Sequence, residues 1–313
     1  MKYRILAKLQ EHAGQYVSGA DLARELGITR TAVWKHIDGL KKEGYRIEGV
    51  SNRGYRLLGN PEGPPDSGFG RQLLCLGEVD STNAVARRLL KEDGLPHGTV
   101  LVAESQTQGR GRRGRQWQSP VGGLWFSLIL RPELTATEVA KLSLVFAVAL
   151  ADGMERYLPG QVRVKWPNDV LVNRRKVAGV LLEMEGEFDK IEYVIAGIGI
   201  NVNVLPEVMP GELRATTTSL MNEMGVRLSL DKVLRDMLLC MEQAYDSFLR
   251  SGWLPFRRRF TRKCIHYGQC VTIRQGDKVL SGTDMGVDEW GCLRLKTAEG
   301  DLYRISAGDV VFD

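Results

Sequence analysis

Four arginines lie within six residues of one glycine-rich segment, Gly109–Trp117. Glycine lets the backbone approach a ligand closely and adopt a positive φ. A guanidinium binds phosphate or carboxylate oxygens through parallel hydrogen bonds. Further along the chain, Lys165–Asp169 and Arg175–Gly179 add two lysines and a carboxylate. These residue types predict a loop that wraps a phosphate and a carboxylate, as the formation of an acyl-adenylate requires.

The arginine-rich segment has other interpretations. Arginine-glycine runs also bind nucleic acid, but they usually recur as low-complexity repeats, whereas this run occurs once, between the apolar stretches 99–103 and 124–130. The segment matches the dinucleotide-binding pattern G-x-G-x-x-G, yet no amphipathic helix follows it. The phosphate-loop pattern G-x-x-x-x-G-K-[ST] does not occur in the sequence. We therefore predict one ordered active-site loop.

The arginine segment is one of five motifs along the chain. The others are Asp80–Asn83, Lys165–Asp169, Lys176–Gly179 and Gly197–Asn201. With these motifs in this order, the chain resembles the bifunctional biotin protein ligases that also repress the biotin operon, over nearly its whole length. The resemblance implies ATP-dependent formation of biotinyl-5'-AMP, with Mg²⁺ accompanying ATP, and transfer of biotin to a lysine of a biotin carboxyl carrier protein.

The resemblance also implies which residues contact each part of the substrates. The residues that match biotin-binding positions are Ser81, Thr82, Asn83, Gln106, Arg110, Gly111, Arg112, Lys176 and Gly179. The residues that match the nucleotide side are Arg113, Arg115, Trp117, Asn168 and Asn201. The expected catalytic residues are Lys176, Arg112, Lys165 and Asp169. Lys176 is the main candidate, because it matches a lysine that bridges a biotin oxygen and the α-phosphate.

The chemistry of adenylation favours cations over a nucleophilic side chain. The carboxylate of the substrate itself attacks the α-phosphate, so fixed positive groups must offset the repulsion between the two anions. Asp169 could orient a lysine or help to hold Mg²⁺, which takes one or two carboxylates in addition to phosphate oxygens. Lys165 could be a phosphate contact or simply the ion-pair partner of Asp169. The sequence leaves these alternatives open.

Other site residues also have structural interpretations. Ser81 or Asp80 could cap the helix that follows them, a role that both residue types commonly fill. Trp117 could cover the adenine or belong to the core. For Trp166 the core is favoured, since it lies next to a strand-like run and would bury a large apolar area.

The pattern of elements predicts a multidomain α+β protein. We expect a winged helix-turn-helix over residues 1–58, a linker over 59–70, a mixed α/β catalytic domain over 71–262 and a small β-domain over 263–313. The resemblance implies that the last of these is an SH3-like barrel. In the catalytic domain we expect amphipathic helices near 138–158 and 231–250, and a hairpin turn at Asn173–Arg175 that places Lys176 at the start of the returning strand.

The N-terminal domain carries the signals of a DNA-binding helix. Ser18, followed by Asp21, resembles a capping box, Gly27 allows a tight turn, and Thr29 can cap the next helix. Within that helix three apolar residues at helical spacing are expected to face the core: Val33, Ile37 and Leu40. The residues expected to contact DNA are Thr29, Arg30, Thr31, Trp34, Lys35 and, at the tip of the wing, Arg53. Arg56 follows as a further candidate for a phosphate contact.

Composition adds weaker constraints. A net charge of +5 over 313 residues is modest, so nucleic-acid binding must depend on local clusters of charge. The five cysteines form no C-x-x-C pair and the N-terminus has no apolar signal segment, which favours a reduced cytoplasmic protein. The four histidines are scattered, so we expect no structural zinc. No apolar run reaches the length of a membrane span.

Three functional hypotheses remain from the sequence. The first is a biotin ligase that also represses transcription, with biotinyl-5'-AMP promoting a homodimer that binds operator DNA. The second is a biotin-sensing repressor without transfer activity, against which the intact Lys176 and arginine set argue. The third is a lipoate-protein ligase, because the same catalytic architecture serves that reaction.

Overall fold

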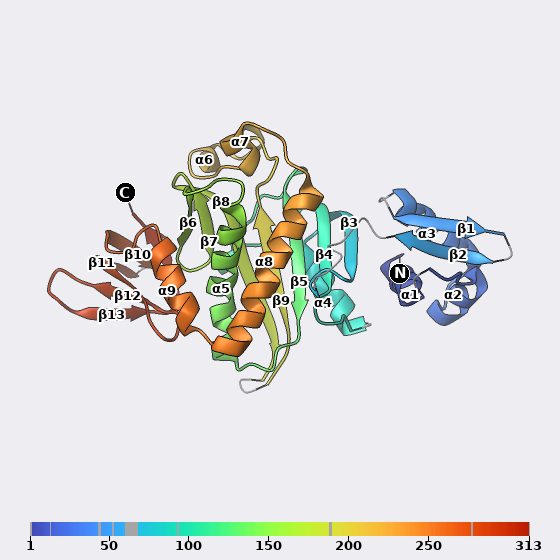
Figure 1. Ribbon diagram of the computed structural model, residues 1–313, viewed down its shortest axis with the longest axis horizontal. Helices are drawn as coiled ribbons and strands as arrows, with labels where there is room; N and C mark the ends of the chain where they lie inside the picture. The colour runs from blue at the N-terminus through green and yellow to red at the C-terminus, as the bar shows by residue number, and fades with distance from the viewer. Residues whose placement is uncertain are drawn as a thin grey trace.

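The computed structural model describes residues 2–12, 14–42, 45–51, 53–59, 68–92, 94–187, 190–276 and 278–312. They form three parts arranged in a row, with a small helical domain at one end, a large sheet covered by helices in the middle, and a small β-domain at the other end (Figure 1). Most of the predicted linker, residues 60–67, lies outside the described residues, as does Asn52 in the predicted wing tip.

The N-terminal domain is a three-helix unit with a two-stranded wing, as predicted. Its elements are α1 (Lys2–Glu11), α2 (Gly19–Leu26), α3 (Arg30–Lys42), β1 (Arg46–Val50) and β2 (Gly54–Gly59). The Ser18 hydroxyl accepts a hydrogen bond from Ala20 N at 3.1 Å, and Gly27 ends α2 with φ 64°. The Thr29 hydroxyl accepts from Ala32 N at 3.1 Å and so caps α3. These contacts confirm the caps and the turn.

The capping-box prediction for this domain was only half right, whereas the core prediction is confirmed. Asp21 does not complete a capping box in the contacts described, because its carboxylate pairs with Arg24 at 3.0 Å, one turn further along α2. The three predicted core residues of α3, in contrast, are buried as expected: Val33, Ile37 and Leu40.

A seven-stranded sheet organises the middle of the chain. Its spatial order is β3 (Leu73–Val79), β4 (Val100–Gln106), β5 (Leu124–Leu130), β9 (Ile191–Ile200), β8 (Arg175–Gly186), β7 (Asp169–Val172) and β6 (Val162–Lys165). Strands β3 and β4 are parallel and are joined through helix α4 (Thr82–Glu92), whereas the remaining neighbours are antiparallel. The sequence of β5 is apolar apart from Ser127, which fits its place inside the sheet, where every one of its residues is buried.

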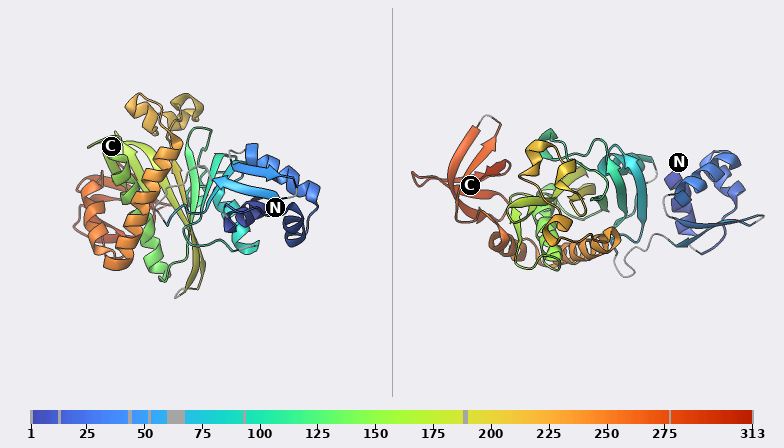
Figure 2. Two further views of the ribbon diagram at one scale, coloured as in Figure 1. Left: turned by 45° about the vertical axis from the view of Figure 1, so that its right-hand side comes forward. Right: turned by 90° about the horizontal axis from the view of Figure 1, so that it is seen from above.

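Helices cover both faces of this sheet (Figure 2). On one face lies α4, and on the other lie α5 (Ala136–Met154) and α8 (Leu230–Ser251). The prediction that α5 is amphipathic was wrong, since residues around its whole circumference, from Leu144 to Ala151, are buried. The reason is that α5 contacts the sheet and is also flanked by α8 and α9, which together cover most of its surface.

Both outer strands of the sheet are covered at particular residues. At the β3 edge the Tyr45 hydroxyl, which comes from the N-terminal domain, donates to Leu73 O at 3.3 Å and accepts from Cys75 N. At the β6 edge, Ile265 N donates to Val164 O at 2.9 Å. The two flanking domains therefore contact opposite edges of the central sheet.

The C-terminal part follows α9 (Leu254–Lys263) and is a five-stranded antiparallel sheet. Its order is β13 (Leu302–Ile305), β12 (Leu293–Lys296), β11 (Lys278–Val287), β10 (Cys270–Gln275) and β14 (Asp309–Val311). This sheet agrees with the small β-domain predicted over residues 263–313. No helix among the described residues is both long and apolar enough to cross a membrane.

Candidate active site

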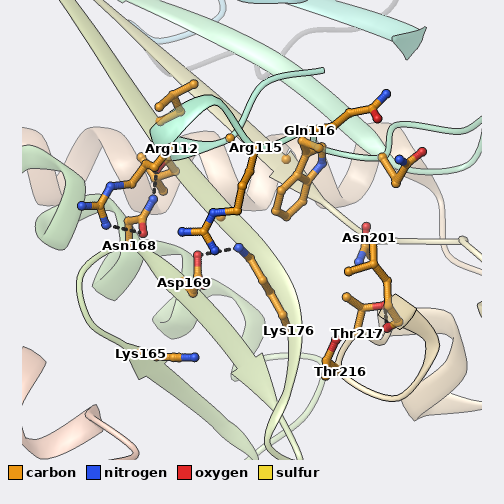
Figure 3. A pocket seen from close by; sticks show the side chains of 18 of the residues that line it. Arg112, Arg115, Gln116, Lys165, Asn168, Asp169, Lys176, Asn201, Thr216 and Thr217 are labelled. Carbon is orange, nitrogen blue, oxygen red and sulfur yellow. Dashed lines mark hydrogen bonds and ion pairs between the residues drawn. The ribbon is translucent and has the colours of Figure 1, made fainter. Parts of the chain in front are cut away.

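One cavity of about 580 Å³ collects almost all of the predicted ligase residues. It lies over β8 and β9, between the arginine loop, the N-terminus of α4 and the turn between β6 and β7 (Figure 3). Two short elements near the cavity, α6 (Gly211–Arg214) and α7 (Leu220–Met224), flank the segment that contains Thr216 and Thr217, which also line it. The volume suits a substrate of the size of biotin or a nucleotide.

One end of the cavity is polar and uncharged. Here Gln106 accepts through Oε1 from Thr82 N at 2.8 Å and donates through Nε2 to the Ser119 hydroxyl at 2.7 Å. Ser81 and Asn83 complete this end, and all three residues at the start of α4 are buried. Buried polar atoms held in fixed positions are suited to recognise a polar ring by hydrogen bonds.

Asp80 has a supporting role beside this polar end. Its carboxylate accepts from Ser81 N at 2.8 Å and pairs with Arg88 at 2.6 Å, and the hydrogen bond from Arg88 holds the pKa of Asp80 below its usual value. Ser81 precedes the first residue of α4, and its carbonyl accepts from Val85 N at 2.9 Å. Both residues therefore belong to the helix start, while Ser81 also lines the cavity.

The other end of the cavity is cationic. Lys176 Nζ lies 2.7 Å from Asp169 Oδ1 and 4.8 Å from the centroid of the Trp117 ring. The hairpin turn at Asn173 and Arg174, both with positive φ, places Lys176 at the start of β8, as predicted. This ion pair fits the first of the two roles considered for Asp169, a carboxylate that orients a lysine.

Two further cations at this end are largely buried. Burial lowers the pKa of Lys165 and the pKa of Arg112. Lys165 Nζ lies 5.3 Å above the Phe312 ring, and Asp169 pairs with Lys176 rather than with Lys165 in the ion pairs described. Arg112 Nη1 donates to Asn168 Oδ1 at 3.4 Å. Buried cations without a full set of counter-charges favour an anionic ligand.

The arginine loop is ordered by contacts within itself and with the C-terminal domain. Gly111 N donates to Arg115 O at 2.7 Å, and Trp117 N donates to Gly109 O at 2.9 Å. Arg115 pairs with Asp309, and Arg113 donates to the Arg274 carbonyl at 3.1 Å. Arg110, Arg112 and Arg115 line the cavity, whereas Arg113 is not among its lining residues, because its side chain extends toward β10.

The indole of Trp117 lies flat against two glycines of neighbouring strands. A Cβ built on Gly199 would lie 2.5 Å from Trp117 Nε1, and one built on Gly179 would lie 3.1 Å from the same ring. Gly179 and Gly199 are paired across β8 and β9, so together they form the surface on which the Trp117 ring packs. The glycines at these positions are therefore explained by the close approach of an aromatic side chain.

Two buried polar atoms near this ring have no hydrogen-bond partner among the described residues. They are the donor Trp117 Nε1 and the acceptor Asn201 Oδ1. The amide nitrogen of Asn201 is satisfied by Thr218 O at 3.0 Å, so only its oxygen is left over. An unpaired buried polar group is costly, and a ligand that offers both an acceptor and a donor would satisfy this pair.

The sequence missed the contribution of the C-terminal residues to this cavity. Residues 309–312 line it, together with Arg174 from the hairpin turn. Residues so far apart in the chain carry no common local signal.

A buried trio connects the C-terminal domain to the Lys165–Asp169 segment. His266 Nδ1 lies 2.8 Å from Asp284 Oδ2, His266 Nε2 accepts from Trp166 N at 3.2 Å, and Cys264 Sγ lies 3.5 Å from the ring nitrogens. Three such groups within 4.8 Å of one another are a possible metal-ligand set. Both ring nitrogens are already engaged in hydrogen bonds, however, so the geometry explains a structural tie to Trp166, whose side chain is buried as predicted.

The predicted DNA-binding residues lie on one exposed region of the N-terminal domain. Thr29, Arg30, Thr31, Trp34 and Lys35 are exposed at the start of α3, and 57% of the Trp34 side chain is accessible. An exposed tryptophan of this size on a helix start is typical of a contact surface.

The wing arginines differ from each other in their contacts. Arg53 is exposed at the tip, and its guanidinium lies 5.6 Å from the Tyr16 ring. Arg56 is paired with Glu48 at 2.6 Å and stacks 4.7 Å over Tyr16, so its charge already has a partner within the domain. Arg53 is therefore the better candidate for a phosphate contact.

Comparisons with known proteins agree with this architecture. Residues 76–201 match the biotin/lipoate A/B protein ligase family, residues 2–56 match an HTH domain, and residues 266–313 match the biotin protein ligase C-terminal domain. The bifunctional ligase/repressor BirA of Bacillus subtilis is 38% identical, with 97% of both chains covered. The protein of the same name from Escherichia coli is 31% identical, with 90% of this chain and 89% of that one covered.

A solved structure supports the same assignment. The biotin protein ligase from Aquifex aeolicus, in complex with biotin and ATP, aligns with a TM-score of 0.67 and 33% identity, and the alignment covers 77% of this chain and 97% of that one. Since the full-length relatives share both the N-terminal domain and the catalytic domain, the chain belongs to the family of bifunctional biotin protein ligases and transcriptional repressors.

Proposed function

We propose that this protein activates biotin with ATP, transfers it to a lysine of a biotin carboxyl carrier protein, and represses transcription in response to biotin. The observation that carries the proposal is a single cavity that joins an uncharged hydrogen-bonding end to a cationic end. Ser81, Thr82, Asn83 and Gln106 would bind the ureido ring of biotin. Gly179, together with Arg110 and Gly111 of the loop, would enclose the rest of the molecule.

In the first half-reaction the biotin carboxylate attacks the α-phosphorus of ATP, the bond to the β-phosphate breaks, and pyrophosphate leaves. Lys176 is held by Asp169 at 2.7 Å and would bridge a carboxylate oxygen and the α-phosphate. Arg112 and Lys165 would offset the charge that gathers on the transferring group. These cations are fixed before the substrate arrives, so they need little reorganisation during the reaction.

The nucleotide would occupy the region around Trp117. The indole ring would cover the adenine, while Trp117 Nε1 and Asn201 Oδ1 would gain the hydrogen-bond partners that they lack. Arg115 and Asn168 lie beside this region in the cavity lining. Mg²⁺ would offset charge on the phosphates, and Asp169 provides a nearby carboxylate oxygen of the kind that Mg²⁺ binds.

In the second half-reaction the amine of an acceptor lysine attacks the acyl carbon, an amide forms, and AMP leaves with the electrons of the broken anhydride bond. The amine is already close to an activated acyl group, so positioning supplies most of the rate enhancement. Because the acceptor amine is itself the nucleophile, the cavity needs no nucleophilic side chain.

Repression would use the exposed surface of α3 and the wing tip. Thr29, Arg30, Thr31, Trp34 and Lys35 would enter the major groove of the operator, and Arg53 would contact the backbone. We further propose that biotinyl-5'-AMP promotes a homodimer that binds paired half-sites, and that the protein acts in the cytoplasm, where its five free cysteines stay reduced.

Streptavidin blotting tests the ligase. The protein, ATP, Mg²⁺ and biotin are incubated with a biotin carboxyl carrier domain. A parallel reaction contains lipoate in place of biotin and is analysed by mass spectrometry, because streptavidin does not bind lipoate. Biotin-only labelling supports the proposal, and lipoate labelling would assign the site to lipoate instead. Tight biotin binding without transfer would indicate a sensor that no longer acts as a ligase.

Gel shift and ultracentrifugation test the regulatory part. By thermodynamic linkage, adenylate binding and dimer formation must strengthen each other by the same factor. An association constant that biotinyl-5'-AMP leaves unchanged would contradict the proposed corepressor role, whatever the outcome of the transfer assay.

A further inference from the structure

A buried hydrogen-bond network lies behind the polar end of the cavity. Ser127, which is fully buried in the middle of β5, places its hydroxyl 2.6 Å from Asn83 Oδ1 and 2.7 Å from Thr82 Oγ1. On the other side of the same amide, Asn83 Nδ2 donates to Glu183 Oε2 at 2.9 Å. Arg87 from α4 holds that carboxylate at 2.9 Å. Neither Ser127 nor Glu183 lines the cavity itself.

The protons in this network can be assigned from the chemistry of the groups. A carboxylate only accepts, so the amide must present its NH₂ group to Glu183 and its oxygen to Ser127. Because Asn83 Oδ1 cannot donate, the single Ser127 proton goes to it. The Ser127 oxygen can still accept from the Thr82 hydroxyl, which also faces Gln106 Oε1 at 3.2 Å. If the amide were reversed, Oδ1 would face the Glu183 carboxylate, and two acceptors would meet without a proton between them.

The amide also has little freedom to move away. A Cβ built on Gly197 would lie 2.5 Å from Asn83 Oδ1, which shows how closely the β9 backbone approaches this side chain. The direction of the amide is therefore set by its partners rather than by the cavity. Asn83 is 4% exposed and lines the cavity.

We propose that Glu183 is a positioning residue that fixes the direction of the Asn83 amide, and that this direction determines the affinity of the site for a cyclic urea. A cyclic urea offers one carbonyl acceptor between two N–H donors, and an amide beside it matches that pattern in only one orientation. This inference rests on the proposed biotin-binding function. It adds two residues, Glu183 and Ser127, that act on the ligand through Asn83.

The test is Glu183→Gln in the full-length protein, with biotin dissociation constants measured by calorimetry. Glutamine keeps the size of the side chain but offers both a donor and an acceptor, so the Asn83 amide can adopt either direction. We expect the Kd for biotin to rise, by about twofold if the two directions are equally populated and by more if the reversed direction is favoured, because only one direction matches the cyclic urea. The Kd for desthiobiotin, which keeps the cyclic urea but lacks the sulfur ring, is expected to rise by the same factor. The KM for ATP is expected to stay unchanged.

Glu185→Gln is the matched control. Glu185 lies two residues further along β8, is exposed, and makes the same change of charge when substituted. Ser127→Ala is the second variant, because it removes the other partner of the amide in a nearly unchanged volume. We expect it to weaken biotin binding several-fold while ATP binding stays at the level of the parent. If Glu183→Gln folds poorly, Ser127→Ala still tests the inference.

The inference is overturned if Glu183→Gln binds biotin as tightly as the parent and the Glu185→Gln control do. It is also overturned if the loss of biotin affinity is matched by an equal loss for ATP, since a general disturbance of the fold would do the same. If the parent itself does not bind biotin, the proposed function fails, and that outcome is seen before any variant is compared.

Discussion

Replacing Gly199 by alanine tests whether Trp117 covers the nucleotide. The new Cβ would lie 2.5 Å from both Cε2 and Nε1 of the indole and 2.8 Å from Cζ2. Carbon atoms in contact are normally about 3.5 Å or more apart, so the ring must move by roughly 1 Å. The backbone of β9 is held by hydrogen bonds to β5 and β8, whereas Trp117 belongs to a loop, so the loop is the part that moves.

The expected cost is that of overpacking, about 1–3 kcal/mol. Because the displaced group belongs to the proposed nucleotide site, this energy is expected to appear in ATP binding, as a rise in the KM for ATP of about 5-fold to 150-fold. Pyrophosphate release measured against ATP concentration gives this value. Tryptophan fluorescence reports the displacement of the ring independently, and thermal unfolding is expected to change little.

Gly77→Ala is the matched control for this substitution. Gly77 is also a strand glycine, it has no positive φ, and a Cβ at this position meets nothing within 4 Å. We expect this variant to keep the kinetics of the parent. If Gly199→Ala shifts the fluorescence of Trp117 but leaves the KM for ATP at the parental value, the ring does not contribute to the nucleotide site and our reasoning is refuted.

Three other predictions concern single side chains. Lys176→Ala is expected to lower pyrophosphate release at least 100-fold, the usual loss for one preorganised charge, while unliganded DNA binding measured by gel shift stays intact; full release by this variant would exclude Lys176 from the mechanism. Arg112→Gly is expected to let biotinyl-5'-AMP escape and to increase the biotin label on bystander albumin, and labelling no higher than the parent's would contradict this role. Burial raises the pKa of the Cys264 thiol from 9.0 to about 12. As the pH rises above about 9, the unfolded chain therefore loses this proton before the folded protein does. The free energy of unfolding is expected to fall by up to about 1.4 kcal/mol per pH unit in this range. Unfolding of the parent and of Cys264→Ala at several pH values checks this, and equal slopes for the two would contradict it.

Local signals in the sequence predicted much of the fold. Ser18, Gly27 and Thr29 mark their helix ends as expected, and the turn at Asn173 and Arg174 places Lys176 on its strand. Each of these depends on a few neighbouring residues, whose preferences are visible in the sequence. The exposure of α5 could not be predicted in the same way, because it depends on what packs against the second face of the helix.

The residues of the candidate site differ in the same way, because some follow from local signals and others depend on contacts between distant parts of the chain. The motif residues could be named because each motif is contiguous, although nothing near Arg113 in the sequence indicates that its side chain extends toward Arg274 rather than into the cavity. The contact between Asn83 and Glu183 spans 100 residues. No local pattern distinguishes Glu183 from the exposed Glu185 two residues later. The contact of Glu183 with Asn83 therefore could not be predicted from the sequence.

The Tyr45 hydroxyl occupies backbone positions of β3 that a neighbouring strand would otherwise use. An outer strand with free amide and carbonyl groups is a template on which another chain can add a strand. At Leu73 and Cys75 this place is taken by one side chain of the DNA-binding domain. Any polypeptide that extends the sheet along this part of β3 must first displace Tyr45, so strand addition there and the seating of the DNA-binding domain on the catalytic domain exclude each other.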